Sequence, residues 1–237
     1  VSTSSWAVVR TLTVTDMVYG LSFTPDGTQI VTLTTDSSTS PPTSHLYVHT
    51  ATNPAATQTV ALTAGWSMGV SPVTVGGALP IAVTTTTGSV LVYNLTAAGL
   101  DSPSSIPVTS NQMTVQMAQF SPSGALLAAG GDDGYLRFWA IPLTGAAQAV
   151  TISIYGATNA KSAYVDAVAF SPDGGELALG GGTEGSVTTF ATGARTQIGV
   201  EQDTSSGADV TALGYSPDGK WIIGGEYACG CVFLCRH

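Results

Sequence analysis

The sequence predicts an all-β fold of about five similar four-stranded sheets, and three observations carry that prediction. A turn phrase recurs along the 237 residues, with its leading positions at 23, 70, 120, 170 and 215. The spacings of 47, 50, 50 and 45 residues are nearly constant, as expected for the blades of a β-propeller. Apolar, strand-like runs follow the phrases, and a second turn signal follows in most repeats.

The recurring phrase has the composition of a tight turn between two strands. Full copies occupy residues 23–27, 120–124, 170–174 and 215–219, and a degenerate copy begins at Val70. Proline presets the backbone for the first central turn position, the Asp side chain can bond to the backbone ahead of it, and glycine tolerates positive φ. Each phrase therefore predicts the hairpin between the first and second strands of a sheet. The second strands are expected at residues 29–33, 125–129, 176–179 and 220–223.

A second turn separates the second and third strands. Its strongest signal is Gly131-Asp132-Asp133-Gly134, whereas a longer Ser/Thr/Pro loop over residues 36–44 replaces it in the first repeat. Third strands are expected at residues 46–48, 90–93, 135–139, 187–190 and 231–234. Weaker fourth strands are expected near residues 57–62, 106–108, 147–154 and 196–200.

The fifth repeat has no visible fourth strand, and residues 6–12 form a spare strand before the first repeat. We expect this strand to complete the last sheet and close the ring, because closure removes exposed sheet edges. The prediction is one domain over residues 1–237. Its blades cover residues 15–62, 63–108, 109–154, 160–200, and 205–237 with strand 6–12.

The run from Gly124 to Trp139 resembles the core of a WD40 blade, and the four full turn phrases resemble that family's first hairpin. The resemblance extends over all five repeats. It implies a WD40-like β-propeller that serves as a protein-interaction scaffold without catalysis. No Gly-His dipeptide precedes a first strand, and the Trp-Asp pair survives only as Trp139-Ala140. The family's buried His–Asp hydrogen-bond network is therefore not expected in its usual form.

Composition excludes several classes of partner. Only 9% of the residues are charged, the net charge is −9, and six residues are Lys or Arg, so a cationic footprint for nucleic acid is missing. No apolar run approaches the roughly 20 residues of a membrane-spanning helix, so membrane insertion is not expected. The low charge and the many Ser and Thr residues slightly favour a secreted or cell-surface location, and the compartment stays open.

Polar residues near the starts of the first strands predict a binding surface at one rim of the central channel. In the four repeats whose first strand ends with an aromatic residue, the position four residues earlier holds Tyr19, Gln116, Asp166 and Thr211, and regular alternation would place these side chains on the face of the aromatic residue. The surface would suit a basic protein or peptide, and a water-filled channel with incidental polar lining is the alternative. The candidate partner-binding residues are Asp16, Tyr19, Gln116, Asp132, Asp133, Tyr164, Asp166, Glu184, Asp209 and Thr211.

Two other functions compete with the scaffold. A lectin-like propeller would repeat aromatic residues in its loops, whereas the aromatic residues here mostly end strands. A glycosidase needs two carboxylates about 5–10 Å apart, and only Asp166 falls well inside a first strand, so no catalytic residue is predicted.

Three cysteines, Cys229, Cys231 and Cys235, lie close to His237 at a spacing that is not a standard zinc pattern. Buried apolar thiols or one local disulfide are favoured over a metal site. Neither a metal nor a cofactor is therefore predicted.

Overall fold

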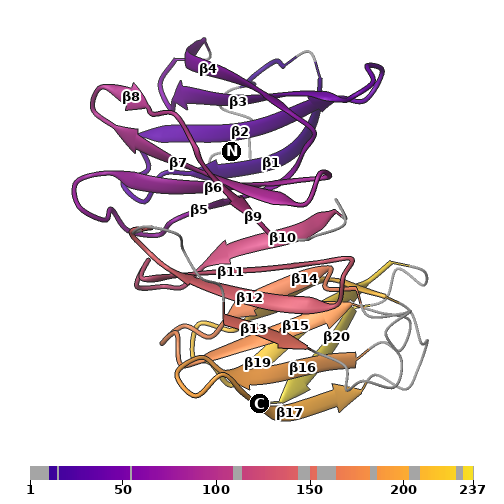
Figure 1. Ribbon diagram of the computed structural model, residues 1–237. Coiled ribbons are helices and arrows are strands. Elements are labelled where there is room, and N and C mark those ends of the chain that lie inside the picture. The colour runs from indigo at the N-terminus through magenta and orange to yellow at the C-terminus, as the bar shows by residue number, and fades with distance from the viewer. Residues whose placement is uncertain are drawn as a thin grey trace.

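The computed structural model describes residues 11–14, 16–53, 55–108, 114–143, 150–153, 164–181, 186–202, 209–227 and 232–236. Within these ranges the regular structure is entirely β, in five antiparallel sheets that follow one another along the chain. Figure 1 shows them in sequence order, from the indigo first sheet to the orange and yellow last two. These residues include no helix of the length and hydrophobicity that crossing a membrane requires. The predicted all-β class is confirmed.

The first, third and fourth sheets have the simplest order, with four strands paired in chain order. The first sheet contains β1 (Met17–Phe23), β2 (Gln29–Asp36), β3 (Thr43–Thr50) and β4 (Ala56–Thr63). The third contains β10 (Val115–Phe120), β11 (Leu126–Gly131), β12 (Tyr135–Ala140) and β13 (Val150–Ser153). The fourth contains β14 (Ala167–Phe170), β15 (Glu176–Gly181), β16 (Ser186–Ala191) and β17 (Thr196–Gln202).

The second and fifth sheets depart from this pattern. In the second sheet two short strands, β8 and β9, pair with different parts of β7 in place of one fourth strand. The second sheet contains β5 (Gly65–Val70), β6 (Leu79–Thr85), β7 (Ser89–Thr96), β8 (Gly99–Leu100) and β9 (Ser104–Pro107). The fifth sheet has three strands among the described residues: β18 (Val210–Tyr215), β19 (Trp221–Glu226) and β20 (Val232–Arg236).

Consecutive sheets meet through their first strands, since β1, β5, β10, β14 and β18 contact one another in that order. This is the arrangement of propeller blades around a channel, and the predicted β-propeller fold is confirmed. Among the described residues β1 and the fifth sheet have no substantial contact. Most of the predicted closing strand, residues 6–12, lies outside the described residues, so ring closure stays a prediction.

The recurring turn phrase forms the predicted hairpin between first and second strands. In the first sheet the Thr24 hydroxyl donates to Asp26 at 2.6 Å, and Gly27 has φ of 69°. The Thr24 hydrogen bond is the largest cause that lowers the pKa of Asp26 below its usual range. The same hydroxyl-to-Asp contact and positive-φ glycine recur within residues 171–174 and 216–219. These aspartates therefore stabilise turns, as the turn chemistry predicted.

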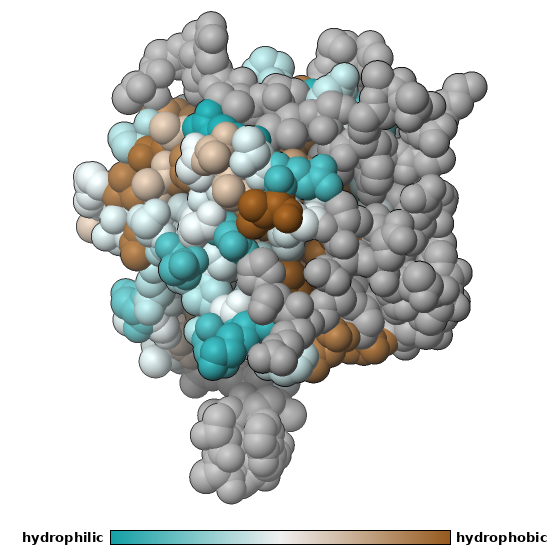
Figure 2. Space-filling view, turned by 90° about the horizontal axis from the view of Figure 1, so that it is seen from below, coloured by the Kyte–Doolittle hydropathy of each residue, from teal (hydrophilic) through white to brown (hydrophobic). Residues whose placement is uncertain are grey.

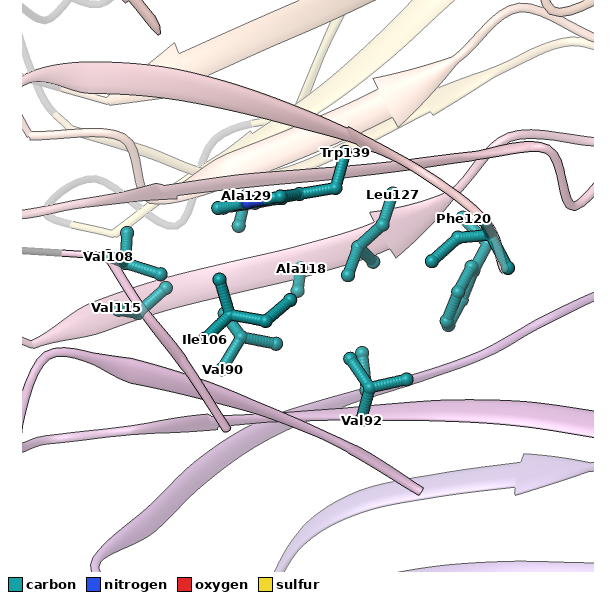
Figure 3. Close-up of a cluster of buried hydrophobic side chains, with 12 residues drawn as sticks. Val90, Val92, Ile106, Val108, Val115, Ala118, Phe120, Leu127, Ala129 and Trp139 are labelled. Carbon is teal, nitrogen blue, oxygen red and sulfur yellow. The ribbon is translucent and has the colours of Figure 1, made fainter. Parts of the chain in front are cut away.

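The hydrophobic core lies between the sheets, not inside any one of them. Figure 3 shows the cluster where the second and third sheets meet, with Val92 opposite Leu127 and Phe120 and with Val90 beside Ile106. Trp139 belongs to this cluster and is 2% exposed, so it is a core residue. Each of these interfaces thus packs residues of a first strand against the neighbouring sheet.

Candidate functional site

A β-bulge in four of the five first strands determines which side chains stand at the channel rim. In β1 the pairing with β2 passes from Val18 directly to Gly20, so the residue between them has no partner. The same skip occurs in β5, β10 and β18. A bulge leaves its extra residue outside the ladder and redirects its side chain. The bulged residues are Tyr19, Trp66, Gln116 and Thr211.

The bulges explain where the sequence prediction was right and where it was wrong. The position four residues before the strand end is indeed equivalent from sheet to sheet, and in the fourth sheet Asp166 occupies it just before β14. Regular alternation with the terminal aromatic residue does not hold, because the pairing register shifts by one residue at each bulge.

An aromatic pair and a hydrogen-bonded chain connect the first three sheets at this rim. The rings of Tyr19 and Trp66 have centroids 5.5 Å apart and are tilted by 47°. Trp66 Nε1 donates to Gln116 Oε1 at 2.7 Å, and Gln116 Nε2 donates to Asp132 Oδ1 at 2.6 Å. Trp66 remains 37% exposed, so the pair offers an aromatic surface to solvent while its polar atom is satisfied.

Three carboxylates continue the rim across the third, fourth and fifth sheets. Burial raises the pKa of Asp166 to about 6, and the negative charges of Asp209 and Asp132 add to the shift. The backbone N–H of Asp166 donates to Gly180 O at 2.9 Å, which fixes the position of the residue on its sheet. The charges of Asp209 and Asp132 that disfavour a further negative charge at Asp166 would attract a cation to the same place.

Two glycines allow the segments that carry these carboxylates to lie close to the second strands. A Cβ on Gly181 would lie 2.1 Å from the carbonyl oxygen of Tyr164, and Gly181 has φ of 146°. A Cβ on Gly131 would lie 2.4 Å from the carbonyl oxygen of Thr114. The side chain of Tyr164 is 39% exposed beside this contact. Larger residues at either glycine would move the rim segments away from their sheets.

Two of the predicted site residues interact with basic side chains of their own sheets. Asp133 receives hydrogen bonds from Arg137 at 3.1 and 2.6 Å, and both side chains are largely buried. Asp16 Oδ2 lies 3.4 Å from His45 Nδ1, a separation that makes an ion pair when the imidazole is protonated. The carboxylate of Asp133 is therefore already neutralised by a cation of its own sheet.

The remaining predicted residues have different outcomes. Thr211 is exposed on β18, at the bulge of that strand. Glu184 lies outside the described residues, as do Cys229, Cys231 and His237. The described ranges contain no group of three or more His, Cys, Asp or Glu residues that could hold a metal ion.

Sequence reasoning missed Trp66, the most exposed aromatic residue of this network. The second copy of the turn phrase begins with Val70, so the aromatic residue that marks the strand end in the other four copies is missing there. The same offset applied to Val70 leads to Trp66. The period of the repeat was the signal that would have found it.

Comparisons with known proteins agree with this architecture. Residues 107–140 match the WD40 family model, described as WD domain, G-beta repeat. A chain in the crystal structure of the mitotic checkpoint complex is similar with a TM-score of 0.76 and 16% identity, over 99% of this chain and 68% of that chain. No curated protein sequence matches this chain. Matches to 1275 chains of solved structures show how widely the fold is shared, so the fold alone does not select one function.

The matched repeat covers the first three strands of the third sheet, the same region that carries Gln116, Asp132 and Trp139. WD40 propellers generally serve as scaffolds for protein–protein interaction and are typically not enzymes. Residues 107–140 thus carry a recognisable WD40 repeat, and the five sheets together have the fold of a β-propeller.

Proposed function

We propose that this chain is a non-catalytic scaffold that binds a basic segment of a protein or peptide at the channel rim. The proposal rests mainly on the contacts that connect the partly exposed Tyr19–Trp66 pair to Asp132, and on the charges of Asp132 and Asp209 that act on Asp166. An arginine side chain suits both parts, since its planar guanidinium stacks on aromatic rings and bonds to carboxylates in pairs.

Electrostatics supports a basic partner. The net charge of −9 attracts cationic segments over long range, and such steering weakens as salt screens it. At short range a bound cation would favour the ionised form of Asp166, whose pKa is raised to about 6 by burial and by neighbouring carboxylates. Binding should therefore strengthen between about pH 5 and pH 7 as Asp166 loses its proton.

A carbohydrate-binding function is less well supported than a protein-binding one. A lectin with equivalent sites between blades would repeat its aromatic residues from sheet to sheet. The position of Tyr19 and Trp66 carries Gln116, Asp166 and Thr211 in the other three sheets. One aromatic pair next to several carboxylates favours a single asymmetric site that binds one extended segment of a partner protein.

Selection from a library of displayed random peptides tests the proposal and requires no assumption about the identity of the partner. The immobilised chain should enrich peptides with Arg or Lys near an aromatic residue. Synthetic copies of these peptides should bind more weakly in high salt, as measured by fluorescence anisotropy. Trp66→Ala and Asp209→Asn should each reduce affinity at least about tenfold, a loss of 1.4 kcal/mol.

Asp101→Asn serves as a matched control, because Asp101 accepts hydrogen bonds from Asn94 in the second sheet and is not part of the rim network. This variant should bind as the unaltered chain does. Enrichment of acidic or purely apolar peptides, or equal binding by all variants, would refute the proposed site. If free sugars displaced every selected peptide, the result would support carbohydrate binding as the function instead.

A further inference from the structure

The second sheet departs from the repeat in two loops that lie at the same end of that sheet. Five residues connect the first and second strands in each of the other sheets, at positions 24–28, 121–125, 171–175 and 216–220. In the second sheet residues 71–78 form this connection, and Gly76 and Gly77 within it have φ of 61° and 85°. The second departure is the hairpin that joins β7 to the short strand β8. Because the first and third strands of an antiparallel sheet run in the same direction, the loops that follow β5 and β7 lie at one end of the sheet.

These two loops and the turn phrase of the first sheet line one cleft of about 550 Å³. That volume lies within the range of roughly 300–1,000 Å³ that is typical of ligand pockets. Val73 and Ala97, one from each loop, line the cleft together with Leu79 and Leu95. Leu79 and Leu95 are 5% and 6% exposed, whereas Val73 is 36% exposed, so the cleft has a buried apolar base below a more open wall. Loops that a rigid sheet holds in this way are the usual place for recognition.

Gln58 of β4 lines the same cleft, and the second sheet holds its side chain in place. Its Oε1 accepts a hydrogen bond from the backbone N–H of Leu100 at 2.7 Å. Gly99 has φ of 120°, and a Cβ there would overlap with the amide of Gln58, so the amide rests directly on the backbone of this glycine. Among the described residues Nε2 of Gln58 donates to no acceptor. The amide oxygen therefore positions the side chain, and its N–H groups are left for an occupant of the cleft.

The lining of the cleft carries little charge. Asp26 is the only charged residue in the described lining, and its carboxylate already accepts hydrogen bonds from Thr24 and from the backbone and hydroxyl of Thr28. Gln29 also lines the cleft, and its side-chain amide has no partner within the described ranges. An anion would find no counter-charge in this lining, and the one carboxylate that could attract a cation is already hydrogen-bonded in its turn. The cleft therefore suits a neutral ligand that exchanges hydrogen bonds with amides.

The equivalent cleft between the fourth and fifth sheets is different in size and charge. Its volume is about 350 Å³, and its lining includes Asp173, Glu176 and Asp218. Counted from the end of each first strand, Glu176 stands at the position of Gln29. A mixture of hydrophilic and hydrophobic residues is ordinary on this protein, as Figure 2 shows in teal and brown at the end of the molecule where the fourth and fifth sheets lie. The cleft between the first and second sheets is distinguished by its larger volume and its uncharged amides.

We propose that this cleft binds a short, uncharged segment of a peptide in an extended conformation. The amides of Gln29 and Gln58 would exchange hydrogen bonds with its backbone, whose N–H and C=O groups are neutral donors and acceptors. One apolar side chain of the segment would pack on Val73, Leu79 and Leu95. A sugar fits less well, because the described lining contains no aromatic ring on which it could stack. The cleft lies beyond the ends of the first strands, whereas the rim residues stand near their starts, so this site is separate from the proposed partner site.

Selection of displayed random peptides at high salt tests the proposal, because salt weakens the binding of basic peptides to the rim. The unaltered chain should enrich peptides in which Leu, Ile or Val stands among uncharged residues. Gln58→Glu keeps an oxygen that accepts from Leu100 and replaces the donating N–H groups with a carboxylate. This variant should keep its melting temperature and bind the selected peptides at least about tenfold more weakly. Ala97→Trp should weaken binding as much by filling the cleft. Gln197→Glu is the matched control, because Gln197 is exposed on β17 in the fourth sheet.

Fluorescence anisotropy with synthetic copies of the peptides measures each affinity. Gln197→Glu and Trp66→Ala should bind as the unaltered chain does, since neither residue lines the cleft. Equal binding by Gln58→Glu and Gln197→Glu, or the enrichment of no peptide, would overturn the proposal. Peptides that all require Trp66 would overturn it as well, because they would bind at the rim, and so would displacement by free sugars, which would assign the cleft to carbohydrate. Because the cleft peptides are selected where rim binding is weak, a failure of the proposed rim site would leave this result unchanged.

Discussion

Replacing Asp166 with Asn should stabilise the folded protein at neutral pH and leave its stability near pH 4 unchanged. Burial, followed by the charges of Asp209 and Asp132, raises the pKa of Asp166 to about 6. The unfolded chain releases this proton near pH 4, so between about pH 4 and pH 6 the folded state holds more protons than the unfolded state. The contribution of Asp166 to the free energy of unfolding therefore falls as pH rises through that window and is constant above it.

The size of the gain follows from the shift. A difference of about two pKa units corresponds to about 3 kcal/mol as an upper bound, and partial access of the carboxylate to solvent reduces it to about 1–2 kcal/mol. For a chain of 237 residues this raises the melting temperature by about 3–6 °C. The backbone hydrogen bond from Asp166 to Gly180 is retained in the variant, so no loss offsets the gain.

Urea unfolding of both proteins between about pH 4 and pH 8 measures the effect as a function of pH. Asp209→Asn is the companion variant, and it should give a smaller gain because it removes one of the two neighbouring charges while burial remains. A gain of equal size at pH 4 and pH 8 would exclude titration of Asp166 as the cause. A loss of stability at pH 8 would show that the ionised carboxylate makes a favourable contact and would refute the reasoning.

Other substitutions test the fold. Trp139→Ala should cost about 3–5 kcal/mol in urea unfolding, since Trp139 is 2% exposed, and a loss below about 1 kcal/mol would contradict its place in the core. Arg137→Met should cost about 3 kcal/mol by leaving the Asp133 carboxylate buried without its cation, and adding Asp133→Leu should recover much of the loss. Gly181→Ala should lower the melting temperature far more than Gly27→Ala. The Cβ at Gly27 has nothing within 4 Å, so that change carries only the backbone penalty of about 1 kcal/mol.

The parts of the fold that could be predicted depend on local chemistry. The hairpin within residues 23–27 is determined by its own proline, aspartate and glycine, and its recurrence near a 50-residue period predicts a series of similar sheets. Burial of Trp139 follows from its place in a strand between two turns. The turns and the strands next to them are determined by neighbouring residues and do not depend on residues far away in the chain.

The rim could be predicted only in part, because its contacts join residues far apart in the chain. The hydrogen bond between Trp66 and Gln116 joins residues that are 50 positions apart in the sequence, and no sequence pattern predicts it. A β-bulge also has no sequence signature strong enough to reveal that alternation fails at Tyr19. The pairing of Asp133 with Arg137 joins a turn residue to the strand that follows it, and the turn signal at residues 131–134 gives no indication of that partner.

The bulged position has a consequence for how such a scaffold can change. Its residue takes no part in the strand ladder, and the neighbours that hold the sheet in place are set by other residues. Side chains as different as Tyr19, Gln116 and Thr211 occupy it in sheets of the same form. In the proposed partner site, exchanges at this position would change which partner is bound while the sheet beneath stays the same. The repeat thus supplies equivalent positions in successive sheets, and a scaffold that binds as we propose could acquire a new specificity by changing one of them at a time.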